Sequence, residues 1–567
     1  MDSTYSLCIK CHEEIEIGLE VSSPARRVIK KNQLSSSHIP TDSEVSQIML
    51  AIHEMQKDVD YLSKLIDELR ARRDKAQRNL DDCRAVVSPV RRVPVEILTE
   101  IFSSCTHKDN HLCVDLDKIH APVLALSQTC SVWRNVAMSI PKLWSGLSLN
   151  LSCQKEGALN LVKLYLHRSA CFPLKINVSA HRTYPDPSDP YRHYSTKLEK
   201  KGRSVLQLML QAYPRWSDVL FDFHLLIYED YYMREYTDDP SNWHSGPFEN
   251  LRSLSLSWAA NPPDCDSFLF HVLVQRPSPM LHSLHLKEYF TSISESLSSL
   301  NPGKISISGV CYDEDLGHIF DIYGQDLRDL VLDVESFEPI EDDIDMVESD
   351  QLSSLTINRS SKDEDDPSST SKIFSCLTLP SLITLDLSVC EDGLQSLLKE
   401  SLIEFIDRSS CPLQELQLAG NLFSSDRDLI QVLILVPTVT HLALDLLSSH
   451  SLYLTQEFFQ HLSYDDPLDT LLPRLKTFQL TFRQRGPNVP LPDPDQILSM
   501  INSRRLSLMS SLGASDCQQL ELFGLSVHLL PNAVAREWAS TITSLLRPLR
   551  RIGLNIELDI RFLKSRD

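Results

Sequence analysis

Apolar residues between Ser43 and Arg84 recur at alternating steps of three and four, in a stretch without proline or glycine. This spacing is typical of the a and d positions of a heptad repeat and predicts one long helix. Thr41 and Glu44 are plausible capping residues at its start. We therefore predict a coiled-coil helix at residues 43–85, whose seam either packs on the rest of the chain or pairs with another helix, including a second copy. The seam consists of Val45, Ile48, Ile52, Met55, Val59, Leu62, Ile66 and Leu69, and it resumes after Arg73 with Ala76 and Leu80.

A different pattern, apolar-x-x-apolar-x-apolar, recurs at irregular intervals from residue 251 onward. It begins at Leu251, Leu281, Leu327, Leu352, Leu382, Leu413, Val439 and Leu475. The last two apolar positions alternate with polar ones, which predicts short strands that each have one buried face. Helical stretches such as 393–409 lie between several of them. Since one such unit cannot bury its strand alone, we expect the units to stack.

Three earlier segments, LWSGLSLNL, PLKINVS and WSDVLFDF, extend this array toward the amino terminus, so we predict one repeat domain at residues 147–567. The acidic stretches 335–350 and 360–372 interrupt it. They are expected to be solvated loops, and the alternative is a docking surface for a basic partner. The polar insertion 180–203 is predicted to be a long surface loop.

The stretch VPVEILTEIFSSC, residues 93–105, predicts a short helix with a broad apolar stripe. Pro94 suits a first helical turn, and the apolar residues that follow recur at helical spacing. A polar loop, CTHKDNHLCVDLDKIH, and two further short helices come next, and Val132 and Trp133 are expected to lie on one side of these helices with other apolar residues. Such short helices cannot cover all of these large side chains, so apolar surface should remain for a partner.

These residues resemble the F-box family. The matching motifs are Val93-Pro94-x-Glu96-Ile97-Leu98-x-x-Ile101-Phe102, then Leu124-x-Leu126-Ser127-x-x-Cys130-x-x-Trp133-Arg134, then Pro141-x-Leu143-Trp144. Val93 stands where leucine is usual. The loop after the first helix is long, as in the fungal F-box type, which often follows a short coiled coil. The resemblance covers residues 88–146, and a purely structural three-helix unit is the alternative.

The resemblance implies a small all-α module that binds the Skp adaptor of a cullin-based ubiquitin ligase. The adaptor-binding residues that it implies are Val93, Pro94, Glu96, Ile97, Leu98, Ile101, Phe102, Trp133 and Trp144. The chain would then be the substrate-recognition subunit of a Skp–cullin–F-box ligase. Its alternative function is that of a coiled-coil and repeat scaffold outside such a ligase.

The later repeats resemble leucine-rich repeats, and Leu413-x-x-Leu416-x-Leu418-x-x-Asn421 comes closest to that family's pattern. Most other units lack the asparagine. The expected fold is therefore an α/β solenoid (irregular leucine-rich-repeat-like), preceded by a small all-α F-box module and an N-terminal coiled-coil helix. A Rossmann-like α/β sheet is the alternative, but the recurring leucines and the scarcity of glycine favour the solenoid.

Charge and composition narrow the possible partners and compartment. A formal net charge of −22 over 567 residues argues against nucleic acid or an anionic membrane as the main partner. No apolar run approaches a membrane span, and the start of the chain lacks a signal-peptide core. The 14 cysteines have no regular spacing, which indicates reduced thiols in the cytoplasm or nucleus. Residues 1–42 are expected to be a flexible lead-in.

Catalytic motifs are not found in the sequence. Cys8, Cys11 and His12 fit the Cys-x-x-Cys-His pattern of haem attachment or half of a zinc site, but no second ligand pair with suitable spacing follows. Phosphate-binding, nucleophile-elbow and metalloprotease motifs are missing as well. We therefore expect no cofactor and no enzyme activity in this chain. It would bring an unidentified target protein close to the conjugating enzyme.

Overall fold

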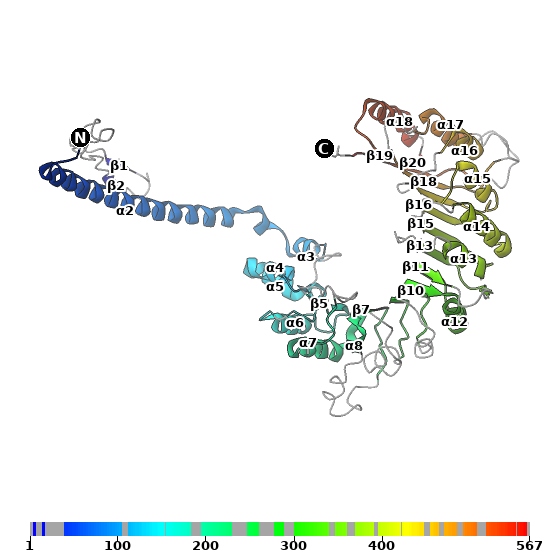
Figure 1. The fold of residues 1–567 in the computed structure, drawn as a ribbon, viewed down its shortest axis with the longest axis horizontal. Coiled ribbons are helices and arrows are strands. Elements are labelled where there is room, and N and C mark those ends of the chain that lie inside the picture. The colour runs from blue at the N-terminus through cyan, green and yellow to red at the C-terminus, as the bar shows by residue number, and fades with distance from the viewer. Residues whose placement is uncertain are drawn as a thin grey trace. The chain divides into compact units, whose positions relative to one another are not determined.

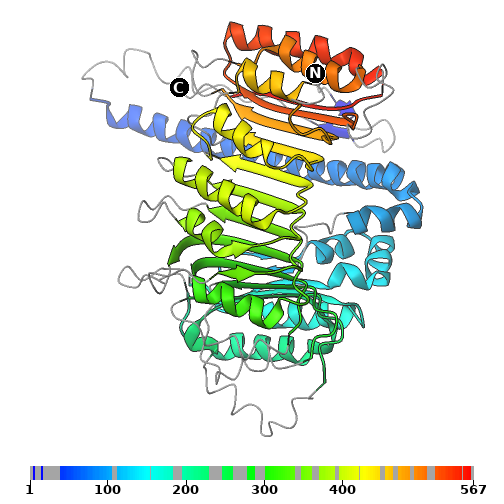
Figure 2. The ribbon, with the colours of Figure 1, turned by 90° about the vertical axis from the view of Figure 1, so that its right-hand side faces the viewer.

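The computed structural model divides the chain into two compact units, Met1–Leu98 and Thr99–Asp567. Each unit is described by itself (Figures 1 and 2). The described residues are 4–6, 14–16, 39–104, 112–153, 155–182, 194–228, 246–259, 277–287, 300–338, 346–359, 369–389, 395–420, 422–446, 454–463, 470–484, 491–506, 518–551 and 553–563.

The first unit is dominated by one continuous helix, α2 (Asp42–Val87), which confirms the predicted long helix within two residues at its carboxyl end. The Thr41 hydroxyl accepts a hydrogen bond from the Glu44 N–H, and the Glu44 carboxylate accepts one from the Thr41 N–H at 2.8 Å. This reciprocal pair is a capping box, so local sequence is enough to start the helix. The short 3₁₀ helix η2 (Pro89–Arg92) follows.

The predicted flexible lead-in at residues 1–42 lies mostly outside the described residues. Its described part includes two short strands, β1 (Thr4–Ser6) and β2 (Glu14–Glu16), which pair antiparallel. Cys8, Cys11 and His12 lie outside the described residues, so the structure does not test the proposed metal or haem ligands.

The second unit is built on a 16-stranded sheet whose strand order follows the order of the chain from β5 to β20. All its pairings are parallel except β3 with β4. The strands are β3 (Leu112–Val114), β4 (Ile119–His120), β5 (Gly146–Asn150), β6 (Leu174–Ser179), β7 (Trp216–His224), β8 (Ser253–Ala259), β9 (Ser283–Lys287), β10 (Lys304–Tyr312), β11 (Asp329–Glu338), β13 (Ser354–Arg359), β15 (Thr384–Val389), β16 (Glu415–Gly420), β17 (His441–Leu446), β18 (Thr477–Arg483), β19 (Leu522–Leu529) and β20 (Asn555–Phe562).

Helices connect these strands, and those from α12 onward lie along one side of the sheet in Figure 1. We call the opposite side of the sheet the open face. The helices are α6 (Ala158–Arg168), α7 (Lys200–Gln211), η4 (Tyr213–Arg215), α8 (Leu225–Tyr228), α12 (Asp313–Tyr323), α13 (Ser369–Cys376), α14 (Gln395–Ser409), α15 (Asp426–Ile434), α16 (Gln456–Leu462), α17 (Pro494–Leu506) and α18 (Ala533–Arg551). A second, two-stranded sheet pairs β12 (Val347–Glu348) with β14 (Leu377–Thr378).

The recurring apolar pattern produces this sheet because its positions align from strand to strand. Leu355, Leu385, Leu416 and Leu442 are register partners in β13 to β17, and all four are buried. Every predicted core from Leu251 to Leu475 contributes a strand, and the three earlier segments contribute β5, β6 and β7. The strand order lacks the reversal of a doubly wound sheet, which argues against the Rossmann-like alternative.

Several predicted loops are partly regular in the structure. The polar loop after residue 104 contains β3, whose buried Leu112 and Val114 pair beside β5. The insertion 180–203 contains a bridge between His181 and Tyr194, and its last residues begin α7. A few buried apolar residues hold these segments in regular structure. They were not predicted because so few apolar residues do not form a recognisable helix or strand pattern in the sequence.

The prediction that the two acidic stretches are loops is also corrected in part, because each stretch contains regular structure. Residues 335–338 continue β11, where Phe337 is buried, and part of 346–350 forms β12. Residues 369–372 begin α13, which Ile373 and Phe374 anchor in the core. Residues 339–345 and 360–368 lie outside the described residues. Among the described residues, no helix combines the length and apolar character needed to cross a membrane.

Candidate functional site

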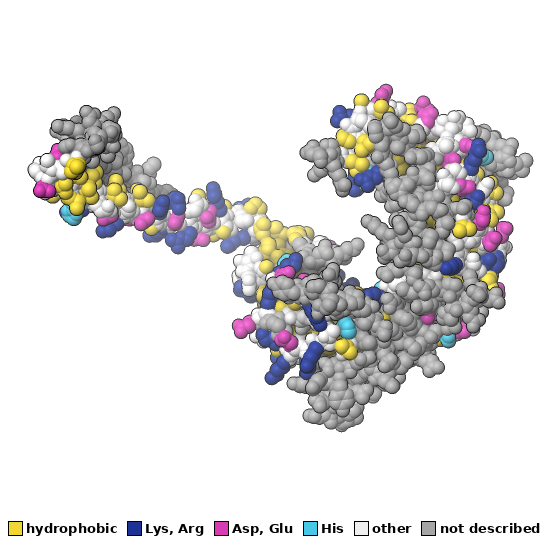
Figure 3. Space-filling view, viewed as in Figure 1, with side chains coloured by type: hydrophobic (Ala, Val, Ile, Leu, Met, Phe, Trp, Pro, Cys, Tyr) yellow, Lys and Arg dark blue, Asp and Glu magenta, His cyan; other side chains and the backbone are white. Residues whose placement is uncertain are grey.

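The helix α3 (Val95–Ser104) carries apolar residues on two sides. Leu98 and Phe102 are 3% and 1% exposed, whereas Ile97 and Ile101 are 52% and 45% exposed. The exposed pair is separated by four residues, so both side chains lie on one face of the helix. Pro94 is also exposed, and its carbonyl accepts the first helical hydrogen bond from Leu98 at 3.0 Å. Hydrophobic side chains gather on the surface around the end of α2 and over α3 (Figure 3).

The buried side of α3 contributes to a small helical core. The Phe102 ring meets the edge of the Trp133 ring at a centroid distance of 5.0 Å. Trp133 lies on α5 (Ser131–Ser139), which packs with α4 (Pro122–Thr129). The Cys130 thiol caps α5 by accepting the Trp133 N–H at 3.4 Å. The motif's cysteine and tryptophan therefore shape the module.

Trp144 joins this module to the sheet. It ends the 3₁₀ helix η3 (Pro141–Trp144), is 2% exposed, and donates from Nε1 to the Ala137 carbonyl at 2.8 Å. Its ring lies edge-on to Tyr165 of α6 at 4.9 Å. Burial raises the pKa of the Tyr165 phenol to about 12, so this contact stays neutral at physiological pH. Trp144 is thus a structural residue at the junction between η3 and β5.

The structure separates the predicted adaptor-binding residues into two groups. Pro94, Glu96, Ile97 and Ile101 are exposed, Val93 and Trp133 are partly exposed, and Leu98, Phe102 and Trp144 are buried. The three buried residues pack inside the protein and have little surface of their own to offer a partner. The adaptor contact of all nine residues stays a prediction. Val132 on α5 is 51% exposed, so part of the apolar side of these helices remains uncovered.

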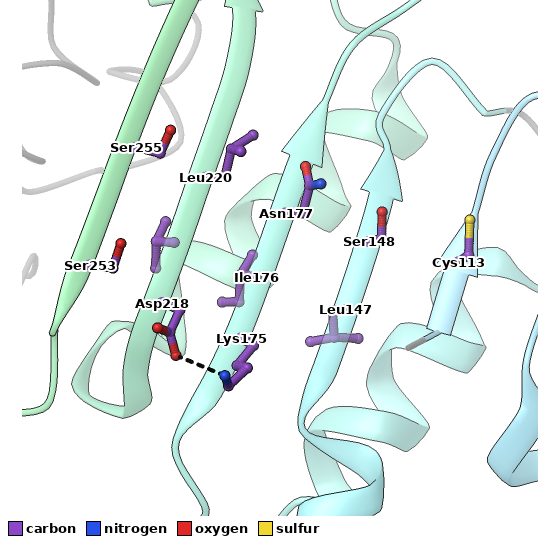
Figure 4. A pocket seen from close by; sticks show the side chains of 11 residues that line it. Cys113, Leu147, Ser148, Lys175, Ile176, Asn177, Asp218, Leu220, Ser253 and Ser255 are labelled. Atoms are coloured by element: carbon purple, nitrogen blue, oxygen red, sulfur yellow. Dashed lines mark ion pairs between the residues drawn. The ribbon is translucent and has the colours of Figure 1, made fainter. Parts of the chain in front are cut away.

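The open face of the sheet offers a second surface. A shallow depression of about 480 Å³ lies on it across β3 and β5 to β8. Figure 4 shows short polar side chains along these strands, and an ion pair between Lys175 and Asp218 at 3.6 Å. The residues that line it are Cys113, Leu147, Ser148, Lys175, Ile176, Asn177, Asp218, Val219, Leu220, Ser253 and Ser255.

A polar cluster lies at the carboxyl ends of β6 and β7. Asp222 accepts hydrogen bonds from Tyr194 at 3.0 Å and pairs with His181 Nε2 at 3.0 Å. Burial alone would raise the pKa of Asp222, but bonds from His181, Ser257 and Tyr194 outweigh it and lower the pKa. The cluster ties His181 and Tyr194 of the insertion to β7. No group of metal-ligating side chains is found among the described residues.

Comparison with known families agrees with the helical module. The F-box-like family model matches residues 90–150. The match starts two residues after the predicted boundary at 88 and continues through β5 to Asn150, beyond the predicted end at 146. A search of curated proteins finds no match to this chain. The chain therefore contains an F-box-like domain, preceded by a long helix and followed by a mostly parallel α/β sheet.

Proposed function

We propose that this protein is the substrate-recognition subunit of a Skp–cullin–F-box ubiquitin ligase. The F-box-like domain binds the Skp-type adaptor, and the sheet holds a target protein. The chain itself supplies no catalytic group. It promotes ubiquitin transfer through proximity and orientation, because it raises the local concentration of target lysines near a conjugating enzyme that carries ubiquitin.

The observation that carries the proposal is the uncovered apolar face of α3 in a domain that matches the F-box-like family. Ile97 and Ile101 remain about half exposed although the other side of the same helix is well packed. Interfaces concentrate their energy in a few such apolar anchors. We place the main adaptor contact on Pro94, Ile97 and Ile101, with Val132 of α5 as a further exposed apolar residue.

The target-binding part is an irregular leucine-rich-repeat-like solenoid in this proposal. Sequential parallel strands, which pair without a register shift from β13 to β20, support it, as do the helices along one side. The open face then resembles the binding surface that stacked repeats provide. Short side chains such as Ser253 and Ser255 leave room there for the side chains of a bound protein.

The adaptor contact can be tested with the double variant Ile97→Gln and Ile101→Gln. Glutamine favours helix at least as well as isoleucine, so α3 should remain folded. Completing the burial of two half-exposed isoleucines contributes about 1 kcal/mol each, so their replacement should weaken adaptor binding at least tenfold. Calorimetric titration of the full chain with purified Skp adaptor measures this.

Ile434→Gln is the matched control, because Ile434 is 60% exposed on the helix α15, far along the chain. It should bind the adaptor like the wild type, and all variants should melt at the wild-type temperature. Full adaptor affinity in the α3 double variant would refute the proposed contact. Failure of the wild-type protein to capture adaptor and cullin would favour the scaffold function instead.

Target binding needs a separate experiment. Ser253→Arg with Ser255→Arg fills the open face without touching α3. Proteins that accumulate with the wild-type chain after proteasome inhibition should be lost from this variant, while adaptor capture remains. Retention of the same proteins by the variant would mean that the target binds elsewhere.

A further inference from the structure

We propose that α2 forms an antiparallel two-stranded coiled coil with α2 of a second copy of this chain. The proposal is independent of ubiquitin ligation and rests on the heptad seam of α2. None of the seam residues, all of which lie in the described part of the chain, is buried. Ala51, outside the seam, is the buried residue of this helix.

The exposure of the seam is costly for an isolated helix. Val45, Ile52, Val59 and Ile66 are each between 41% and 55% exposed, and they recur on one side of a 46-residue helix. Most helical stability in proteins comes from packing an apolar face rather than from intrinsic propensity. A second helix along this seam would supply that packing over a length of roughly 60 Å.

The residue types at the seam favour two strands. The a positions from Val45 to Ile66 are all β-branched, and the d positions from Met55 to Leu69 are methionine or leucine. In parallel coils this combination selects dimers over larger bundles. Whether the two helices pair parallel or antiparallel then depends on the polar and charged residues at and beside the seam.

Charge distinguishes the two orientations. In a parallel coil, Arg73 at an a position would face Arg73 of the second copy, with Arg70 and Arg72 at the adjacent e and g positions of both helices. Exposed pairs on the same helix, such as Arg72 with Glu68 at 2.9 Å, offset this repulsion only weakly. A parallel pairing therefore places two like charges against each other in the Arg73 layer, with further arginines beside them.

An antiparallel coil centred on Lys64 removes this conflict. Each a residue then packs on a d residue of the second copy, and Arg73 lies against Met55, where its aliphatic stem can pack while the guanidinium reaches water. Asp58 and Arg72, both at g positions, approach each other twice by symmetry. The layers are Val45 with Cys83, Ile48 with Leu80, Ile52 with Ala76, Met55 with Arg73, Val59 with Leu69, and Leu62 with Ile66.

This register uses nearly the whole helix and matches large residues with small ones, as Ile52 with Ala76 shows. It also separates the carboxyl ends of the two α2 helices by roughly 70 Å, at 1.5 Å per residue. A parallel coil would hold those ends side by side. Since the F-box-like domain follows α2 in the sequence, the two F-box-like domains of an antiparallel dimer begin at opposite ends of the coil.

Cysteine cross-linking of the full-length protein tests the orientation. Cys83 is an exposed free thiol at a d position. In the antiparallel coil it faces Val45, so Val45→Cys should give a covalent dimer on oxidation with diamide, joined between the introduced thiol and Cys83 of the second copy. Peptide mass spectrometry identifies the bond, and adding Cys83→Ser should abolish it. A bond between the two Cys83 residues in the wild-type protein would show a parallel coil and overturn the proposal.

Light scattering tests association itself. The wild-type protein should have twice the chain mass of 64.5 kDa at micromolar concentration. Leu62→Asp with Ile66→Asp places four carboxylates at the centre of the coil and should weaken the dimer at least 100-fold. Tyr61→Asp, on an exposed residue of the same helix that lies off the seam, should leave the dimer intact. A wild-type monomer, or equal effects of the two charge variants, would refute the dimer.

Discussion

Arg504 of α17 is a buried arginine whose loss should destabilise the carboxyl-terminal units. It is 2% exposed, and its guanidinium donates to the carbonyls of Leu462, Leu471 and Leu472. These carbonyls belong to the end of α16 and to the connection that follows it. The arginine therefore fastens one strand-helix unit onto the end of the previous one.

The substitution Arg504→Met keeps much of the aliphatic volume and removes all three donors. Hydrogen bonds to charged groups contribute about 1.5–3 kcal/mol each, but they are not additive and the buried charge itself carries a desolvation cost. We therefore expect a net loss of about 3 kcal/mol. The neighbouring Arg505 is a matched control, since it is only partly buried and donates to the Leu520 carbonyl at 3.2 Å. Arg505→Met should cost about 1 kcal/mol.

Urea unfolding followed by tryptophan fluorescence measures both variants. Trp538 of α18 is 8% exposed and donates to the Pro492 carbonyl at 2.7 Å, so its emission reports on the same region. The Arg504 variant should unfold at a clearly lower urea concentration than the Arg505 variant, with unchanged slope. Equal midpoints for the two variants would refute the clamping role of Arg504.

Two further predictions concern the sheet. Leu385→Asp, in β15, should lower the melting temperature strongly because it places a charge in the core. Ile383→Asp, at an exposed position two residues earlier, should not. Equal melting temperatures of the two variants would mean that the register of β15 in the sheet is wrong. Because the pKa of Asp222 is lowered on folding, its stabilisation is present above 3.8 and is lost as the pH falls through the lower folded value. Asp222→Asn should therefore destabilise the protein at pH 7, and its urea midpoint should converge with that of the wild type as the pH falls through the lowered pKa of Asp222. A constant difference would contradict this.

Much of the secondary structure was predictable from short-range pattern. The helix α2 is defined by its heptad spacing, its capping residues and the proline at position 89, all of which act within a few residues. The strands from β8 to β18 that begin with the recurring leucine core were predicted because alternation reports one buried face. β10, β19 and β20 were not predicted; the apolar residues of β10 and β20 do not follow the spacing of that core.

The candidate site was predictable as a module but not as a surface. The motifs from Val93 to Trp144 indicated an F-box-like domain, and the family match at residues 90–150 agrees. They did not indicate that Leu98, Phe102 and Trp144 are buried while Ile97 and Ile101 are exposed. Apolar residues surround α3 on both sides, so its periodicity cannot tell which side is covered.

Local sequence therefore determined where most of the helices and strands form, because caps, prolines and apolar spacing act over a few residues along the chain. Tertiary structure alone decided which surfaces those elements cover. Arg504 follows an ordinary helical stretch and would be expected in solvent, yet three carbonyls from distant positions bury it. Burial depends on what packs against a residue, and such partners lie far away in the sequence.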